Sequence, residues 1–240
     1  MKYFVSSDIH GFYDKWMSAL TDKGFDISNL DHKIILCGDL FDRGRQPKQI
    51  IDFILKNKDK FILIKGNHED LIEDMIERNK SEIHDFHNGT ADTFVDLYPQ
   101  WMISEFDLKK ISKLTGLDEV LSMYINYFET EKHIFIHGWI PINYENYSYS
   151  KNWRNATKEQ WKKSRWLSPL EMYKNKFFEP NKTIVCGHWH CSVFWANQHP
   201  EQYTEFGPKA NFEPFITKDI MAIDACTAYS KKVNVVVIED

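Results

Sequence analysis

The sequence predicts an α/β fold for this chain of 240 residues. Two observations lead to this fold class. Apolar runs of strand length alternate with amphipathic stretches of helical spacing in the first third of the chain. Five of the chain's apolar runs are followed at once by aspartate, asparagine or histidine side chains. Because open α/β sheets usually bind ligands outside the carboxyl ends of their strands, we expect these side chains to share one crevice.

The first third of the chain is typical of consecutive βαβ units, whose strands pair in parallel through right-handed crossovers. The second helix begins with a proline, and Ile50, Ile54 and Leu55 cover one face of it. That face should pack on the sheet. The expected strands are Lys2–Ser7, Lys33–Cys37 and Lys60–Lys65, and the expected helices are Phe12–Thr21 and Pro47–Asn57.

The strand signal is then lost, and we expect a helical insertion over about residues 70–130 that covers the crevice as a cap. Its first helix, Glu69–Asn79, opens with acidic residues that favour the positive end of the helix dipole. We interpret these acids as a solvated face rather than as catalytic groups. They are Glu69, Asp70, Glu73 and Asp74. Asn88-Gly89 predicts a turn, and Asp107–Glu129 is expected to be helical with an interruption near Thr115.

The strand signal returns in the last part of the chain. Asn143–Lys176 is aromatic-rich and irregular in pattern, and Asn197–Thr217 contains three prolines and is expected to be a long loop. We find no internal repeat, low-complexity tract or linker, so we expect a single domain over residues 1–240. The expected strands are His133–His137, Lys182–Gly187, Ile220–Cys226 and Val233–Ile238.

Composition argues against several classes of function. Lysine and arginine number 30 against 35 aspartates and glutamates, and the net charge of −5 disfavours a broad basic groove for nucleic acid. The sequence shows no signal-peptide pattern and no apolar stretch near the ~20 residues that span a bilayer, so we expect a cytoplasmic protein without a membrane partner. Nothing demands more than a monomer. The four cysteines show no C-x-x-C spacing and are expected to be reduced.

Two motifs are more specific than the others. Gly38–Gly44 places two aspartates three residues apart, beside an arginine, on a turn between glycines that let the backbone approach a ligand. Gly66–Glu69 ends a strand in Asn-His, for which core packing offers no reason. The Asp-x-His motif alone would be a weak signal. Together with His137 and Gly187–His190, these motifs predict a dinuclear metal centre built from strand ends.

These residues resemble the motifs of the calcineurin-like metallophosphoesterases, and within them the phosphoprotein phosphatase branch with its bacterial serine/threonine phosphatase and diadenosine tetraphosphate hydrolase relatives. The matching pattern is D-x-H, G-D-x-x-D-R-G, G-N-H-E, H-G and G-H-x-H, over residues 8–190. The resemblance implies two mixed β-sheets sandwiched between helical layers. It also implies that Ile223–Cys226 belongs to the closing strands of that fold.

The resemblance further implies two divalent metal ions. Two metals ~3.5–4 Å apart make a nucleophile from water and clamp the phosphoryl oxygens. Mixed nitrogen and oxygen ligands suit manganese, iron or zinc better than magnesium or calcium, and we expect manganese. Asp39 matches the bridging ligand of the family. The implied ligands of the first metal are Asp8 and His10, and those of the second are Asn67, His137 and His188.

By the same resemblance, His68 is the general acid that protonates the leaving oxygen, and Asp42 orients its imidazole. Arg43 would bind phosphate through its planar guanidinium. The family usually supplies a second phosphate-binding arginine, for which Arg154 and Arg165 are the candidates here. The local Ser-Arg-Trp pattern resembles bacterial relatives and favours Arg165. The alternative is a surface arginine stacked on tryptophan.

Two departures from the family pattern affect the pocket. Trp139 stands where the branch normally has a second glycine, which makes the wall bulkier. His190 is a second histidine that the branch often lacks, and it is either a ligand of the first metal or a support behind one. Trp139, Trp189 and Trp195 form either a wall that stacks on a nucleobase or, as we favour, a hydrophobic shell that dries the site.

We therefore expect a metal-dependent phosphoesterase in which a dimetal-bridging hydroxide attacks phosphorus directly, without a covalent enzyme intermediate. The expected substrate and partner is a phosphoprotein carrying phosphoserine or phosphothreonine. A diadenosine-polyphosphate hydrolase is the close alternative, because it uses the same core motifs, and a nuclease fits the acidic balance less well. A non-catalytic binding module is the alternative of another class, against which the complete set of ligands and the histidine acid argue.

Overall fold

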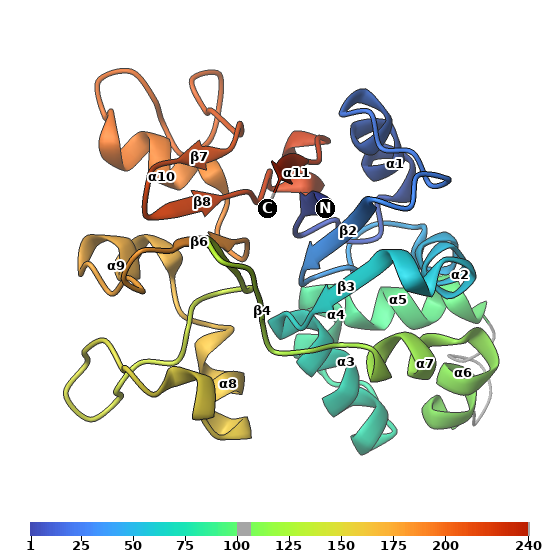
Figure 1. The fold of residues 1–240 in the computed structure, drawn as a ribbon. Coiled ribbons are helices and arrows are strands. Elements are labelled where there is room, and N and C mark those ends of the chain that lie inside the picture. Colours follow the sequence, from blue (N-terminus) through green and yellow to red (C-terminus); the bar gives the residue numbers. More distant parts are fainter. Residues whose placement is uncertain (100–106, 240) are drawn as a thin grey trace.

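Two mixed sheets form the centre of the molecule, for which the computed structural model describes residues 1–99 and 107–239 (Figure 1). The first sheet has the order β3 (Phe61–Ile64), β2 (His32–Cys37), β1 (Lys2–Ser6) and β9 (Val236–Glu239). The second has the order β4 (Phe128–Glu129), β5 (His133–Phe135), β6 (Thr183–Cys186), β8 (Ile220–Ala222) and β7 (Phe215–Ile216). β1 to β3 are parallel, as are β5, β6 and β8, so the expected parallel pairing is confirmed.

The two sheets face each other across a dry interior. Side chains alternate between the two faces of a strand, so the apolar runs serve two cores. Val5 and Ile35 of the first sheet meet Phe135 and Val185 of the second in the space between them. Their chain neighbours, such as Phe4, point to the helices on the outside. Because both faces of these strands are buried, their sequences are continuous apolar runs rather than alternating ones.

A helical layer covers the outer face of each sheet, on the right and on the left of Figure 1. The layer on the first sheet contains α1 (Tyr13–Asp22), α2 (Pro47–Lys56), α3 (Asn67–Arg78), α5 (Thr90–Leu97), α6 (Leu108–Thr115) and α7 (Leu117–Ser122). The layer on the second sheet contains α8 (Lys158–Ser164), α9 (Pro169–Lys174) and α10 (Cys191–Gln198). The expected sandwich of two mixed sheets between helical layers is thus confirmed.

Short elements differ from the sequence predictions. β4 lies in the stretch expected to be helical, and β7 lies in the expected long loop. Each contributes only a two-residue edge to a sheet, too short to show an alternating pattern. α8 and α9 form inside the segment expected to be irregular, where the Thr157 and Ser168 side chains accept a backbone hydrogen bond at each helix start.

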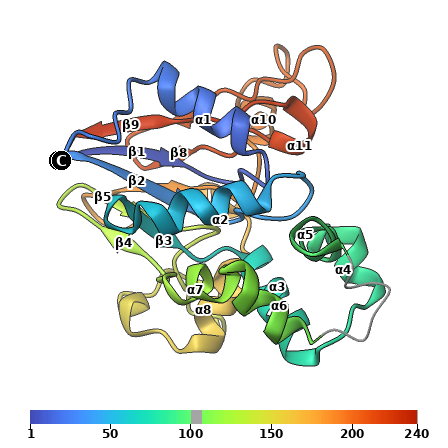
Figure 2. The same cartoon turned by 90° about the vertical axis from the view of Figure 1, so that its right-hand side faces the viewer.

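The helical insertion predicted over residues 70–130 divides into two parts. Residues 100–106 of this segment lie outside the described residues. α6 and α7 pack on α3 and α2, with the break between them at Gly116 as expected, and so extend the helical layer. α5 also packs on α2, and Gly89, at the junction of α4 (Ile83–Asn88) and α5, lies against the segment that precedes α2 (Figure 2). That a cap closes over the crevice stays a prediction. None of the described helices combines the length and the apolarity that a membrane crossing requires.

Candidate metal centre

The ends of strands from both sheets meet at one pocket of about 380 Å³. Asp8 follows β1, Asp39 follows β2, and His188 follows β6. Asn67 and His68 open α3 directly after β3. The sequence therefore correctly gathered these groups from the rule that polar side chains follow buried strands.

The backbone around the pocket is strained in a consistent way. Asp8, His10, Asp39, Asp42 and His188 all have positive φ angles between 44° and 71°. Such angles cost an L-residue roughly 1–2 kcal/mol each, so they persist only where the surroundings impose them. Their concentration here indicates that loop conformation, in addition to strand position, sets the direction of these side chains.

Two glycines let the loops approach closely enough to form the site. A Cβ on Gly66 would lie 2.1 Å from Asp39 Oδ1, and a Cβ on Gly187 would lie 2.1 Å from Asp8 Oδ2 and 1.7 Å from Ser7 Oγ. Both positions face a carboxylate of the site. No side chain fits in either gap, which explains why each of these motifs begins with glycine.

Asp39 lies between two groups of histidines that could each hold a metal ion. Its Oδ2 atom is 3.9 Å from Nε2 of both His10 and His68, while its Oδ1 atom is 3.4 Å from Nε2 of His137. The first group is His10, Asp39 and His68, and the second is Asp39, His137 and His188. A carboxylate with one oxygen toward each group fits the bridging role that the family resemblance implied.

The other implied ligands surround these groups. Asp8 Oδ1 is 4.0 Å from His10 Nε2, and Asn67 Oδ1 is 2.8 Å from His137 Nε2. The far nitrogens of the histidines are held by carbonyl oxygens: His10 Nδ1 lies 2.9 Å from Phe41 O, and His137 Nδ1 lies 2.8 Å from Cys37 O. Each bond leaves Nε2 to face the Asp39 carboxylate, and metal-binding histidines are usually held in this way through their other nitrogen.

Burial and crowding perturb the proton affinities of these groups. Burial lowers the pKa of His188 to about 3, and burial together with the Arg43 and His68 charges lowers the pKa of His10 well below its usual range. Both imidazoles therefore offer a free nitrogen at neutral pH. Burial disfavours a charged His137, but the Asp39 carboxylate outweighs it and raises the pKa of His137 to about 10. A metal at this nitrogen would displace a proton.

The predicted acid, its orienting carboxylate and the phosphate-binding arginine lie together. His68 Nδ1 is 2.6 Å from Asp42 Oδ2. Burial disfavours the His68 cation, yet the Asp39 carboxylate and the Asp42 hydrogen bond outweigh burial and raise the pKa of His68. The exposed Arg43 lines the pocket, with its guanidinium nitrogens 3.1 Å from His10 Nε2 and 3.2 Å from His68 Nε2. The Asp42 contact at Nδ1 leaves Nε2 directed into the pocket, which is the geometry that an acid needs.

The interpretation of the acids at the start of α3 as a solvated face is wrong for two of them. Glu69 is fully buried, and its carboxylate accepts backbone N–H bonds from Asp39, Leu40 and Gly66 at 2.8–2.9 Å. Asp70 is buried as well. Glu69 thus fixes the loop that carries Asp39. A glutamate at the third helical residue after glycine, where a capping carboxylate reaches back, was the available signal.

The second phosphate-binding arginine is not evident from the contacts. Arg165 is buried and binds Asp70 Oδ2 at 2.9 Å and Asn126 Oδ1 at 2.7 Å, and it does not line the pocket. Arg154 lies between Glu129 and Glu179, at 2.8 Å and 2.9 Å. A phosphate-binding role for either residue would require its ion pair to open, and it stays a prediction.

His190 and the tryptophans take different positions around the site. His190 lines the pocket, but its ring nitrogens lie 2.9 Å from Ser192 Oγ and 3.5 Å from Glu205 Oε1. Its role as a metal ligand therefore stays a prediction. Of the three tryptophans expected near the site, Trp189 lines the pocket. Trp139 is buried in the core of the second sheet, and Trp195 packs beside it.

Sequence reasoning missed several residues that line the pocket. They are Asn88, Trp166, Glu205, Asp224 and Cys226. Asp224 follows β8 and obeys the same strand-end rule as the metal ligands, so it could have been found. Burial and the Asp8 carboxylate raise its pKa well above the usual range. The others come from loops and a helix end, where no sequence pattern marks them. All four cysteines are free, as expected.

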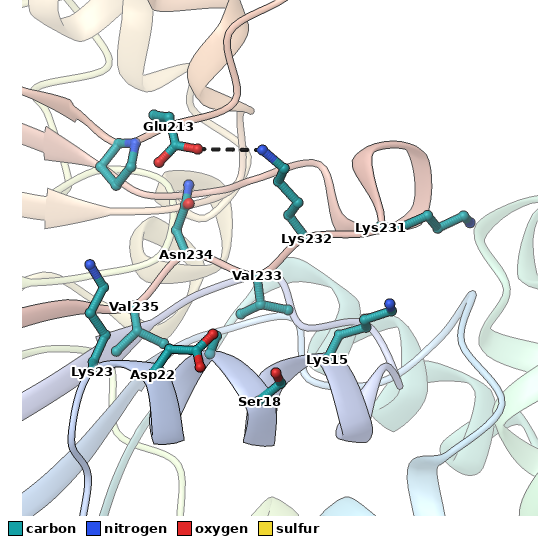
Figure 3. Close-up of a pocket in the computed structure, with 12 residues that line it drawn as sticks. Lys15, Ser18, Asp22, Lys23, Glu213, Lys231, Lys232, Val233, Asn234 and Val235 are labelled. Atoms are coloured by element: carbon teal, nitrogen blue, oxygen red, sulfur yellow. Dashed lines mark hydrogen bonds and ion pairs between the residues drawn. The ribbon is translucent and has the colours of Figure 1, made fainter.

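A second hollow of about 300 Å³ lies between α1 and residues 233–235, away from these ligands (Figure 3). Four lysines and two acids contribute to its lining, which contains no histidine. Lys232 Nζ lies 3.5 Å from Glu213 Oε1. Its side chains do not form a metal-binding group, and we assign no function to it.

Comparison with known proteins links the chain to phosphatases. It is 34% identical over 73 residues, 30% of this chain and 22% of the relative, to the zinc-dependent endopolyphosphatase of Saccharomyces cerevisiae. It is 30% identical over 76 residues, 28% of this chain and 30% of the relative, to the asymmetrical bis(5'-nucleosyl)-tetraphosphatase of Bacillus velezensis. These matches span less than a third of either relative.

A solved structure extends the likeness of the fold to the whole chain. The cold-active protein tyrosine phosphatase of a Shewanella species superposes with a TM-score of 0.53 at 17% identity, over 100% of this chain and 75% of that one. The model of the calcineurin-like phosphoesterase family matches residues 1–192, which include every predicted ligand and catalytic residue. The chain therefore belongs to the calcineurin-like phosphoesterases, a family of metal-dependent hydrolases of phosphate esters.

Proposed function

We propose that this chain cleaves a phosphate ester or anhydride bond with two divalent metal ions held on either side of Asp39. The observation that supports this proposal is the geometry of that carboxylate, which turns one oxygen to His10 and His68 and the other to His137. Neutral imidazoles and buried carboxylates fit divalent transition metals. Manganese is the metal to test first, and zinc and iron have the same donor preference.

The side chains supply the remaining parts of a hydrolysis. When bound, two such ions would lower the pKa of a water and neutralise charge on the phosphoryl oxygens. Arg43 lies in the pocket with a planar guanidinium that can bind two phosphoryl oxygens at once. His68, held by Asp42 through Nδ1, can donate the proton on Nε2 to the leaving oxygen. A direct attack by water needs no covalent enzyme intermediate.

Dinucleoside polyphosphates are the first candidate substrates. The relative from Bacillus velezensis is named for a bis(5'-nucleosyl)-tetraphosphate, and the relative from Saccharomyces cerevisiae for polyphosphate, so both names point to phosphate anhydrides. Phosphoserine and phosphothreonine in proteins are the second candidates, supported by the forms of the Gly38–Gly44 and Gly66–Glu69 motifs. A cytoplasmic location and a monomeric state stay predictions.

Substitution of the bridging carboxylate tests the proposal. Asp39→Asn removes the charge that both metals would share and keeps the shape of the side chain. Manganese-dependent hydrolysis of nitrophenyl phosphate should then be lost, while circular dichroism shows an intact fold. The matched control is Asp52→Asn on α2, where the carboxylate is exposed and pairs with Lys48. This control should keep full activity, and a chelator should abolish activity in the wild type.

Two results would decide against this function. Retained manganese-dependent turnover in Asp39→Asn would show that the carboxylate does not hold the metals. A wild-type protein that hydrolyses neither nitrophenyl phosphate, nor diadenosine tetraphosphate, nor a phosphoserine peptide would favour the binding module. Comparison of the latter two substrates at equal concentrations ranks the two candidate classes.

A further inference from the structure

Two exposed tryptophans stand at the metal pocket. Of the tryptophans that the structure describes, Trp166 and Trp189 alone are exposed by more than a third, at 50% and 39%. Both line the pocket that contains the metal ligands. Exposure of an indole forfeits one of the largest hydrophobic gains that a side chain can make on burial. Two such residues at one site therefore require a reason other than the stability of the fold.

Both tryptophans are positioned by the second metal-binding group. The Trp166 ring stands edge-on to the His188 imidazole, with a centroid distance of 6.0 Å and an interplanar angle of 87°. Trp189 is the next residue in the chain, and its backbone N–H donates to Gly187 O at 2.8 Å. The indoles thus lie beside the place where a phosphoryl group would bind.

Three of the other described tryptophans use their indole N–H within the fold, whereas Nε1 of the buried Trp16 has no partner. Trp139, Trp153 and Trp195 each donate their Nε1–H to a protein oxygen, at 2.8–3.1 Å. In the described part of the chain, neither Trp166 nor Trp189 donates its indole N–H to a protein acceptor. These two donors and the exposed parts of both rings are open to a ligand.

The chemistry of the pocket defines that ligand. It must carry phosphate for Arg43 and the metal ligands, and it must carry a flat aromatic group for the indoles. A nucleotide has both, and base stacking on aromatic side chains is sequence-tolerant because every base has a π-face. Asn88 and Glu205 add polar groups to the same lining, suited to ribose hydroxyls or base edges. A phosphoserine peptide offers no aromatic group at a fixed distance from its phosphate, and the ring of phosphotyrosine is bonded directly to the phosphate oxygen, which leaves it no chain to reach from Arg43 to the rim.

We propose that Trp166 and Trp189 form a base-binding rim that selects nucleoside polyphosphates as substrates of the metal centre. This inference rests on the proposed phosphoesterase function. The rim differs from the nucleobase wall considered from the sequence, which consisted of Trp139, Trp189 and Trp195. In the rim, Trp166 takes the place of Trp139 and Trp195. The base stacks on the rim while its phosphate chain extends toward Arg43.

The test compares substrates with and without a base. Diadenosine tetraphosphate and inorganic tripolyphosphate are hydrolysed with manganese by the wild type, Trp166→Ala, Trp189→Ala and the double variant. The preference for the dinucleotide, taken as the ratio of kcat/KM values, should fall roughly 10- to 100-fold in the double variant, as expected for the loss of one stacked base. Trp166→Phe should retain most of the preference for the dinucleotide that Trp166→Ala loses. Tyr147→Ala, which removes an equally exposed aromatic ring outside the pocket, should not change the ratio.

Each outcome bears on the rim. An unchanged ratio in the double variant would overturn it, as would a loss of phosphoserine-peptide hydrolysis with the dinucleotide unaffected, which would assign the indoles to a protein substrate. An equal loss on both phosphate compounds would show that the tryptophans only support the metal centre. The proposed function fails differently, because the wild type would then hydrolyse neither nitrophenyl phosphate, nor diadenosine tetraphosphate, nor a phosphoserine peptide.

Discussion

Gly66→Ala is the smallest change that should disable the metal centre. Gly66 has φ −94° and ψ 178°, a conformation that any residue adopts, so a substitution there costs no backbone strain. The effect must come from the added Cβ alone. That atom would lie 2.1 Å from Asp39 Oδ1, 2.6 Å from Asp39 N and 2.8 Å from Glu69 Oε2.

The size of the effect follows from these contacts. Ordinary van der Waals contact begins near 3.4 Å, so the Asp39 carboxylate would have to retreat by more than 1 Å. Rotation of the side chain cannot relieve the contact with the Asp39 backbone nitrogen, and the loop itself must move. A displacement of about 1 Å costs on the order of 10²-fold in catalysis. Overpacking of this kind lowers the free energy of unfolding by about 1–3 kcal/mol.

Gly24→Ala is the matched control, because alanine there would strain the backbone but would contact no neighbouring atom. Gly24 has φ +80° and nothing within 4 Å of an added Cβ, so alanine there costs strain without a clash. We expect a loss of roughly 1–2 kcal/mol in urea unfolding and no change in turnover. Manganese titration by calorimetry and hydrolysis of nitrophenyl phosphate compare the variants. Wild-type metal affinity and turnover in Gly66→Ala would refute the reasoning.

Two further predictions concern α3 and its contacts. His68→Asn should reduce kcat for a phosphoserine peptide by about 10²–10⁴-fold and hydrolysis of nitrophenyl phosphate much less, because a good leaving group needs little protonation; equal losses would count against the acid role. Asp70→Asn leaves the buried Arg165 without its ion partner and should lower the free energy of unfolding by about 3–5 kcal/mol. Asp74→Asn, which breaks a more exposed pair with Lys162, should cost no more than about 1 kcal/mol, and similar urea midpoints for both variants would contradict this difference.

The strands were predictable because their signal is local. β1, β2 and β6 are continuous apolar runs followed by polar loops, and burial on both faces leaves few other sequences possible. β4 and β7 have no such signal, because each is a two-residue edge that pairs only once its neighbouring strand is in place. Their conformation depends on the sheet rather than on their own residues.

The residues of the site also divide into those with a local sequence signal and those that depend on tertiary contacts. The gathering of the polar groups in one pocket was predictable, since they follow buried strands, and their roles as metal ligands rest on the family resemblance. The buried partner of Arg165 was not, because Asp70 lies 95 residues away in the sequence. Glu69 resembles any acid in a first helical turn until the backbone donors of Asp39 and Leu40 are placed around it. The capping position of Glu69 marks the start of a helix, but it does not reveal that the carboxylate also holds the Asp39 loop.

The insertion is attached to the predicted catalytic residues, which limits how it can move. Thr93 Oγ1 donates to Asp42 Oδ1 at 2.7 Å and accepts the Asp42 backbone N–H at 2.9 Å, and Thr90 Oγ1 donates to Asp42 Oδ2 at 3.1 Å. Both threonines belong to α5, and Asp42 is fully buried. A swing of α5 would leave this carboxylate, and with it the His68 imidazole, without its supports at a cost of roughly 1–3 kcal/mol for each buried group. A closure of the insertion that keeps these hydrogen bonds must therefore leave α5 in place.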